Sequence, residues 1–206
     1  GGEMEELNNA LAEINVAMPA TIVSYNAGNQ RATVKPSLAK RLSNGDTLQA
    51  PQIVNVPVCF PVADVGGNKA MITLPMKAGD GVLLVFSQRS IENWLDGSKG
   101  SPDDPRMFDL SDAFAMPSCN AKSPAADAEN LSIQYGAGSL KITPSGDVLI
   151  DSPNVTVNCP TTTFNGDIQL NGSMTASGDV SAGGISLQSH KHGGVQGGPS
   201  KTGGPE

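Results

Sequence analysis

The sequence predicts an all-β protein with two differently built halves, a barrel followed by a stack of short repeated strands. Residues 20–119 contain short runs of β-branched and aliphatic residues separated by turn sequences, a pattern typical of a small antiparallel barrel or sandwich. Glycine then recurs every sixth residue from Gly166 to Gly184, which indicates a repeat architecture. The composition also changes, because every arginine and the only tryptophan lie before residue 120, while Gly, Ser, Thr, Asn and Asp dominate after it. The second half therefore lacks the large apolar residues that an ordinary core needs.

The first 18 residues form a predicted N-terminal helix. Its apolar residues follow one another at alternating steps of three and four, the seam pattern of a short coiled coil: Met4, Leu7, Leu11, Ile14 and Met18. Such a helix is marginal alone, because helices shorter than about 12–15 residues are barely stable in water. Two roles stay open, an amphipathic arm on the chain's own domain or one member of a bundle around a symmetry axis. Met18-Pro19 is expected to end the helix.

Residues 19–120 form the predicted barrel. About five strands in this length suit an OB-fold barrel, with tight turns at Asn44-Gly45 and Gly79-Asp80-Gly81, because glycine adopts positive φ at little steric cost. Residues 87–112 combine helical spacing around Trp94 with a proline-rich stretch, so we expect a short helix and a lid on the barrel. The small and polar residues 121–130 are predicted to form a linker.

The six-residue repeat lies within residues 131–189. Between successive turns, apolar or small side chains alternate with polar ones, as in Ile168 and Leu170 or Val180 and Ala182. This alternation predicts strands with one buried and one wet face. So few units cannot stand alone, because each repeat buries its face only against its neighbours. The missing surface must come from other chains, and three copies around a common axis would form a prism. The pattern requires an oligomer more firmly than it requires three copies.

Both histidines of the chain, His190 and His192, lie directly after the repeat. As residues i and i+2 of a continuing strand they would point to the same side. Two imidazoles cannot close a metal site, but three chains would supply six, enough for an octahedral shell. This favours iron over zinc, which prefers four ligands in structural sites, and a filled shell would be structural rather than catalytic. The alternatives are a chance pair on a wet surface or the remnant of an expression tag.

The last residues, 193–206, are rich in glycine and proline. Such a composition is ordinarily that of a disordered tail. Glycine also allows sharp reversals where chains converge on an axis, so the tail could instead fold back over the metal. Residues 190–206 are therefore predicted to form an apex with the iron site.

Charge and hydropathy exclude several classes of function. The formal net charge of −7 argues against nucleic acid as a partner, because such binding needs clustered Lys and Arg. No apolar run approaches the roughly 20 residues that span a bilayer, and the acidic start does not resemble a signal peptide, so we expect synthesis in the cytoplasm. Cys59, Cys119 and Cys159 are far apart, which predicts buried thiols rather than disulfides or a zinc site.

Five stretches of the chain together carry a family resemblance: "ATIVSYNAGNQRATVKP", "VNVPVCFPV", "ITLPMKAGDGVLLVFSQRSIENWL", "MFDLSDAFAMP" and, at the end, "SHKHGGVQGGPSKTGGP". They resemble the central baseplate spike of contractile-tailed bacteriophages, in particular the Gp138 type with an N-terminal OB-fold domain. The resemblance covers nearly the whole chain.

The resemblance implies more than the spacing does. Such spikes are homotrimers with a barrel domain, an intertwined triple-stranded β-helix and a pointed apex, where an HxH pair from each chain holds one iron ion. This implies that His190 and His192 are the ligands here. Calcium and chloride also occur in the β-helix of some relatives. The family implies a non-enzymatic virion protein that sits under the tail tube, contacts tail hub or baseplate proteins, and is driven through the host outer membrane when the sheath contracts.

Two other functions remain as alternatives. One is a carbohydrate- or peptide-binding adhesin module on a β-helical stalk, since OB-like barrels often bind such ligands. The other is a hexapeptide-repeat acyltransferase, whose trimeric β-helix uses a histidine as general base. The acyltransferase fits less well, because its repeat usually runs much longer and both histidines here lie together near one end.

Overall fold

The computed structural model describes residues 2–98, 101–194 and 197–198. The chain divides into two compact units, Gly1–Glu129 and Asn130–Glu206, which we call unit 1 and unit 2 and describe separately. The division lies at the end of the stretch that the sequence predicts as a linker. Most of the regular structure is β, with few helices, so the prediction of an all-β protein is confirmed.

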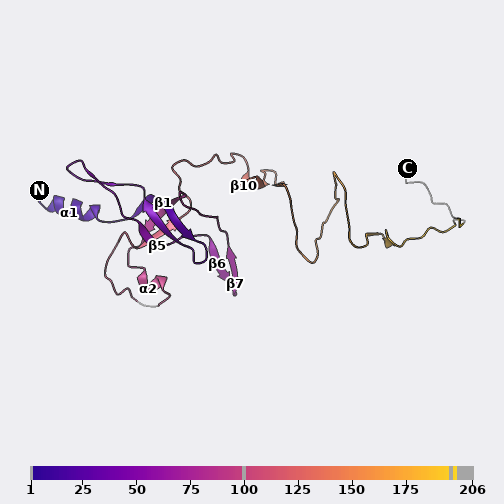
Figure 1. Cartoon of the computed structure of the whole chain (residues 1–206), viewed down its shortest axis with the longest axis horizontal. Helices are drawn as coiled ribbons and strands as arrows, with labels where there is room; N and C mark the ends of the chain where they lie inside the picture. The colour runs from indigo at the N-terminus through magenta and orange to yellow at the C-terminus, as the bar shows by residue number, and fades with distance from the viewer. Residues whose placement is uncertain (1, 99–100, 195–196, 199–206) are drawn as a thin grey trace. The chain divides into compact units, whose positions relative to one another are not determined.

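Unit 1 contains two helices and nine strands among its described residues (Figure 1). Their bounds are α1 Gly2–Ala12, β1 Ala17–Asn26, β2 Arg31–Pro36, β3 Lys40–Arg41, β4 Thr47–Leu48, β5 Ile53–Pro57, β6 Val62–Val65, β7 Asn68–Met71, β8 Gly81–Phe86, α2 Glu92–Leu95 and β9 Ala113–Met116. Five of the strands form the main sheet, whereas β3–β4 and β6–β7 are separate antiparallel hairpins. The hairpin β3–β4 encloses Gly45, whose φ of 92° suits the predicted turn.

The main sheet has the strand order β5-β2-β1-β8-β9, and every neighbouring pair is antiparallel. Its two edges meet, because Val58, just after β5, bridges to Ala115 of β9 in parallel. The Cys59 amide also donates to the Ala115 carbonyl at 2.8 Å. The sheet is therefore curled strongly enough for its first and last strands to come together.

The core of unit 1 lies on the inner face of this curled sheet. Strands β2 and β8 alternate between buried and more exposed positions, as strands with one face toward a core do. The buried apolar residues that pack together are Ala20, Ile22, Ala32, Val34, Ile53, Val56, Val58, Phe60, Val82, Leu84, Phe86, Ala113 and Ala115. One cluster that draws on all five strands explains why the barrel region can fold within one chain.

The N-terminal helix is shorter than predicted. It ends at Ala12, and Met18 and Pro19 lie in β1 instead of terminating the helix. The Asn15 side-chain amide donates to the Phe108 carbonyl at 2.8 Å, and Met18 pairs with Leu84 of β8. In β1, Met18 and Pro19 belong to a strand paired with the sheet, whereas a helix of two heptads is marginal alone. Tertiary structure therefore overrides the helical preference that the spacing indicates.

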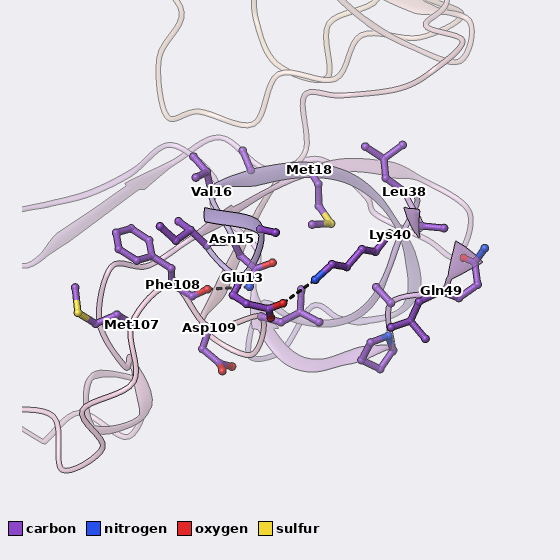
Figure 2. Close-up of a pocket in the computed structure, with 18 residues that line it drawn as sticks. Glu13, Asn15, Val16, Met18, Leu38, Lys40, Gln49, Met107, Phe108 and Asp109 are labelled. Carbon is purple, nitrogen blue, oxygen red and sulfur yellow. Dashed lines mark hydrogen bonds and ion pairs between the residues drawn. The ribbon is translucent and has the colours of Figure 1, made fainter. Parts of the chain in front are cut away.

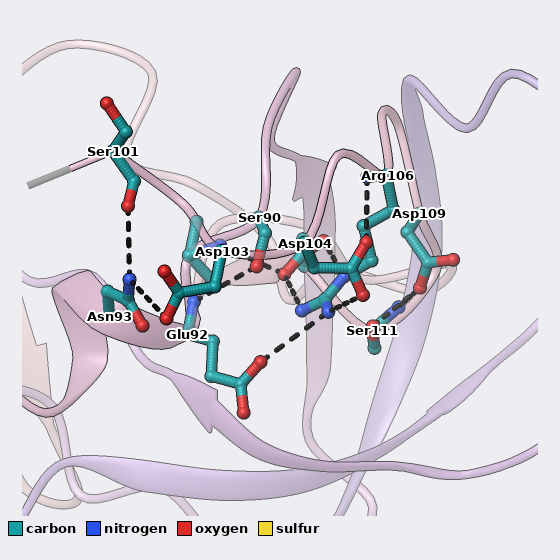
Figure 3. A network of polar contacts seen from close by, with 11 residues as sticks. Ser90, Glu92, Asn93, Ser101, Asp103, Asp104, Arg106, Asp109 and Ser111 are labelled. Atoms are coloured by element: carbon teal, nitrogen blue, oxygen red, sulfur yellow. Dashed lines mark hydrogen bonds and ion pairs between the residues drawn. The ribbon is translucent and has the colours of Figure 1, made fainter.

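The segment 87–112 contains the predicted short helix, α2, and is held at its base by a buried ion pair (Figure 3). Asp112 is only 1% exposed and accepts bonds from Arg106 Nε at 2.7 Å and Arg106 Nη2 at 2.9 Å. The same carboxylate accepts the Ile91 amide at 3.0 Å. Asp104 and Glu92 approach the guanidinium from the solvent side at 2.9 and 3.6 Å. One buried carboxylate therefore joins both ends of the segment.

These contacts shift the pKa values of Asp104 and Arg106. The backbone amide and then the guanidinium of Arg106 donate to Asp104 and lower the pKa of that carboxyl. Hydrogen bonds to Asp112 and then to Asp104 outweigh burial and raise the pKa of Arg106. Both groups are therefore charged across the ordinary pH range.

Unit 2 contains a three-stranded antiparallel meander and a small hairpin. The meander consists of β10 Leu131–Tyr135, β11 Gly138–Ile142 and β12 Val148–Asp151, and the hairpin of β13 Ser181–Ala182 and β14 Ile185–Ser186. Residues 152–180, which the structure describes throughout, contain no strand. The predicted triple-stranded β-helix therefore stays a prediction.

One face of the meander is entirely apolar along two rows of paired residues. Leu131 pairs with Ile142, which pairs with Val148; Ile133 pairs with Leu140, which pairs with Ile150. Directly paired residues of an antiparallel sheet share a face, so these six side chains lie on one side. All six are exposed, and no described residue of unit 2 is buried.

The cysteines differ from expectation in their burial. Cys59 and Cys159 are exposed and Cys119 is partly buried, and all three are free thiols. Cys59 follows the strand alternation, since Val58 and Phe60 on either side of it are buried. The prediction of buried thiols was therefore wrong for Cys59 and Cys159.

We expect Leu84→Ala to lower the free energy of unfolding of unit 1 by about 2–5 kcal/mol, because it leaves a cavity at a fully buried position. Urea unfolding followed by Trp94 fluorescence measures this. Leu74 is 52% exposed, and Leu74→Ala is the matched control, with an expected change within about 0.5 kcal/mol. Equal effects of the two substitutions would contradict the assigned core.

We expect Asp112→Ala to destabilise unit 1 by about 3–5 kcal/mol, because it removes the buried partner of Arg106 and leaves the Ile91 amide without a hydrogen-bond acceptor. Asp103→Ala is the control, since Asp103 makes only a 3.4 Å contact with Asn93 at the surface. The same urea titration compares them. A loss for Asp112→Ala no larger than that of the control would show that the ion pair does not hold the segment.

Candidate functional site

The candidate site lies beyond a tight hairpin at the end of unit 2. Ala182 pairs with Ile185 and Ser181 with Ser186, and the connecting Gly183 and Gly184 have φ of 60° and 82°. Positive φ at both central residues is the requirement of a type I′ turn, which favours glycine. The pair of glycines that closes the six-residue repeat thus builds the reversal that precedes His190.

Asp179 and Ser186 hold the chain that leads from the hairpin to the histidines. The Gln188 amide donates to Asp179 Oδ1 at 3.1 Å, and the Ser189 amide donates to Ser186 Oγ at 2.9 Å. Hydrogen bonding by the Ser186 side chain, followed by that of the Gln188 amide, lowers the pKa of Asp179. An ionised Asp179 therefore organises this turn at neutral pH.

The two histidine side chains lie next to each other and are both exposed. Their ring centres are 5.1 Å apart, with an angle of 77° between the ring planes. His190 Nδ1 lies 2.9 Å from the Ser186 carbonyl oxygen, and the His190 amide donates to the same oxygen at 3.2 Å. Residues 187–189 form a turn, so the expectation that a continuous strand carries the pair was wrong. The turn, not strand alternation, brings the rings together.

The separation of the two rings is short enough for both side chains to approach one metal ion. A metal–imidazole bond of about 2.0–2.1 Å places rings on adjacent positions of one ion with centres roughly 4.5–5 Å apart, close to the observed separation. When Nδ1 of His190 carries the proton, it donates to the Ser186 carbonyl and leaves Nε2 free to bind metal. A carbonyl in this role is typical of histidine ligands.

One chain does not complete the shell. Within the part of the chain that the structure describes, no group of three or more His, Cys, Asp or Glu side chains is placed to hold a metal ion. Further ligands would have to come from other copies of the chain. Of the tail 193–206, which the sequence predicts as a cap or a disordered end, residues 195–196 and 199–206 lie outside the described residues.

Sequence reasoning found the histidines but missed the residues that position them. Asp179 belongs to one unit of the repeat and Ser186 to a strand, and neither differs in type from the other polar residues around it. The sequence does contain one signal of the hairpin that precedes the histidines. It is the Gly183-Gly184 pair, which replaces the single glycine of the preceding units.

Unit 1 carries a separate groove of about 750 Å³ (Figure 2). It is lined by the chain after α1, the β3–β4 region and the loop before β9, with Met18, Leu38, Leu48, Phe108 and Leu110 as its main apolar residues. Glu13 and Lys40 point toward each other and form an ion pair at 2.7 Å. The bond from Lys40 lowers the pKa of Glu13, so the Glu13 carboxyl group is ionised at neutral pH.

Two family matches cover more than half of the 206 residues. Residues 18–118 match the phage protein Gp138 N-terminal domain, and residues 184–206 match the GpV apex motif. The chain belongs to the phage baseplate spike proteins of the Gp138/GpV type. No curated protein matches the chain.

The two matches correspond to the two regions described above. The Gp138 match includes all five strands of the main sheet of the spike and omits α1. The apex match begins at Gly184, in the hairpin turn, and includes His190 and His192. Membership of this family places the spike in the baseplate of the virion. Among the described residues, none of the helices has the length and apolar character that a membrane span requires.

We expect Asp179→Ala to speed hydrogen exchange of the Gln188 amide, because the substitution removes its acceptor. NMR exchange rates of the full spike measure this, and Asp167→Ala, in an earlier unit of the repeat, is the control. In the unsubstituted spike the depressed pKa of Asp179 means that protection is present at neutral pH and lost as the pH falls through that pKa. Unchanged exchange in Asp179→Ala would contradict the assigned role.

Proposed function

We propose that the spike is a homotrimeric needle that pierces the host outer membrane when the tail sheath contracts. The observation that carries the proposal is the exposure of the apolar side chains of unit 2 within one chain. Ile168, Leu170 and Met174 are 60, 58 and 68% exposed. The six apolar side chains on one face of the meander are exposed as well, and exposed apolar patches mark interaction surfaces.

Three intertwined copies would bury this surface. Each short repeat has an apolar side and a polar side, and a closed triple-stranded β-helix turns the apolar sides inward. Such a trimer cannot release one chain without opening all its interfaces, which favours slow unfolding under load. The Ser, Thr, Asn and Asp side chains would form the outer surface, so contact with the membrane would be mechanical. The proposal includes no enzymatic activity.

The tip of the needle would be stabilised by iron. His190 and His192 of three chains would together supply six imidazoles, and imidazole is a suitable ligand for iron. The metal would link the three chain ends, so that its binding energy contributes to assembly. By family resemblance, calcium and chloride ions would also bind within the β-helix, and no residue of this chain is assigned to them.

Unit 1 would mount the spike on the tail hub or another baseplate protein. The strand order β5-β2-β1-β8-β9, closed by the parallel bridge between Val58 and Ala115, supports an OB-fold, a five-stranded and partly open Greek-key barrel. In this proposal the barrel is the base and the histidine pair is the tip.

We expect purified, tag-free spike to have the mass of a trimer by light scattering and to contain about one iron per three chains, because six imidazoles complete one octahedral shell. The double substitution His190→Ala/His192→Ala should abolish the iron in elemental analysis. Lys191→Ala, between the two ligands, is the matched control and should retain it.

The possible results separate the parts of the proposal. A monomeric mass would overturn the needle. A trimer that binds no iron would overturn the metal tip and leave the needle standing. Saturable binding of the spike to an oligosaccharide or peptide array, at the groove of unit 1, would favour the adhesin function instead.

A further inference from the structure

Among the described residues of unit 1, none packs closely enough on helix α1 to bury any of its side chains. None of its eleven residues is buried, and Met4, Leu7 and Leu11 are 66, 53 and 56% exposed. An isolated helix of this length is marginal in water. Helix α1 therefore needs another surface on which to bury its apolar side chains. The structure thereby excludes one of the two roles that the sequence left open, an arm packed on its own domain.

The spacing of the apolar residues specifies the kind of surface. Met4, Leu7 and Leu11 occupy successive a, d and a positions of a heptad, and Ile14 follows at d. The turn continues past the end of α1, because the Ile14 amide donates to the Leu11 carbonyl at 3.3 Å. A stripe confined to a and d positions is the narrow seam of a coiled coil, narrower than the face that a helix buries on a globular core.

The charges of α1 agree with self-association. The residues that flank the seam within the helix are Glu3, Asn8 and Ala10, so only the first is charged, whereas Glu5 and Glu6 lie on the outer positions b and c. Copies of an acidic helix repel one another when like charges border the seam. Here most of the negative charge lies away from it.

We propose that α1 of each chain packs along this seam against α1 of the other copies, in a parallel bundle at the base of the spike. The number three rests on the proposed trimer. Chains already joined through unit 2 hold their N-termini at a high effective concentration, so a helix too short to associate freely can do so within the assembly. The spike would then be held together by a second interface, separate in sequence from the β-helix and from the metal.

Disulfide trapping in the full-length spike tests the bundle. The native Cys59, Cys119 and Cys159 are first replaced by serine. Leu7→Cys then places a thiol on the seam, and Asn9→Cys, the matched control, places one on the outer position f. After mild oxidation with diamide and boiling in SDS, we expect Leu7→Cys to form linked dimers about tenfold faster than Asn9→Cys, because only seam thiols are held together.

Light scattering of the reduced variants distinguishes the possible failures. A trimeric mass with equal crosslinking rates for the two variants would overturn the bundle and leave the trimer intact. A monomeric mass for both would overturn the trimer, and the bundle with it. Faster crosslinking of Asn9→Cys in a trimer would place the opposite face of α1 between the chains and would also contradict the proposal.

Discussion

The burial of apolar side chains within unit 2 is the constraint on which the rest of the spike depends. Unit 1 satisfies this constraint alone, because its curled sheet encloses Val34, Val82 and Leu84 without any exposure to solvent. Unit 2 does not, because its meander and repeat present their apolar side chains to solvent. The hydrophobic effect scales with the apolar area removed from water, so the trimer that we propose would be the main source of stability for unit 2.

The two units are therefore stabilised by different kinds of interaction. Unit 1 has a core that draws on strands distant in sequence, and a buried ion pair that ties its longest loop. Unit 2 has local hydrogen bonds at its turns, such as those of Asp179 and Ser186, but no core among the described residues. Local bonds set the path of the chain, and only inter-chain contacts could make that path rigid.

The sequence predicted the strands of unit 1 well because their alternation directly reflects burial. Strands β2 and β8 both lie within residues 20–119, where the sequence predicts short strands of β-branched and aliphatic residues, and both alternate between buried and more exposed positions. The end of α1 was missed because Met18 continues the helical spacing yet pairs with Leu84, a partner 66 residues away that no local pattern reveals. At the apex, the HxH spacing identified both histidines, but the turn at 187–189 and its support by Asp179 depend on three-dimensional contacts.

The carboxylate of Asp112 also has a consequence for how the protein can change. It accepts the Ile91 amide across 21 residues of chain and the Arg106 guanidinium nearby, so the segment enters and leaves the sheet at one fixed point. The entropic cost of closing a loop rises only slowly with the length of the loop. Insertions between α2 and Asp103 would therefore alter the exposed end of the loop while the strands beneath it keep their register. Changes in the length of this loop are therefore compatible with the fold of unit 1.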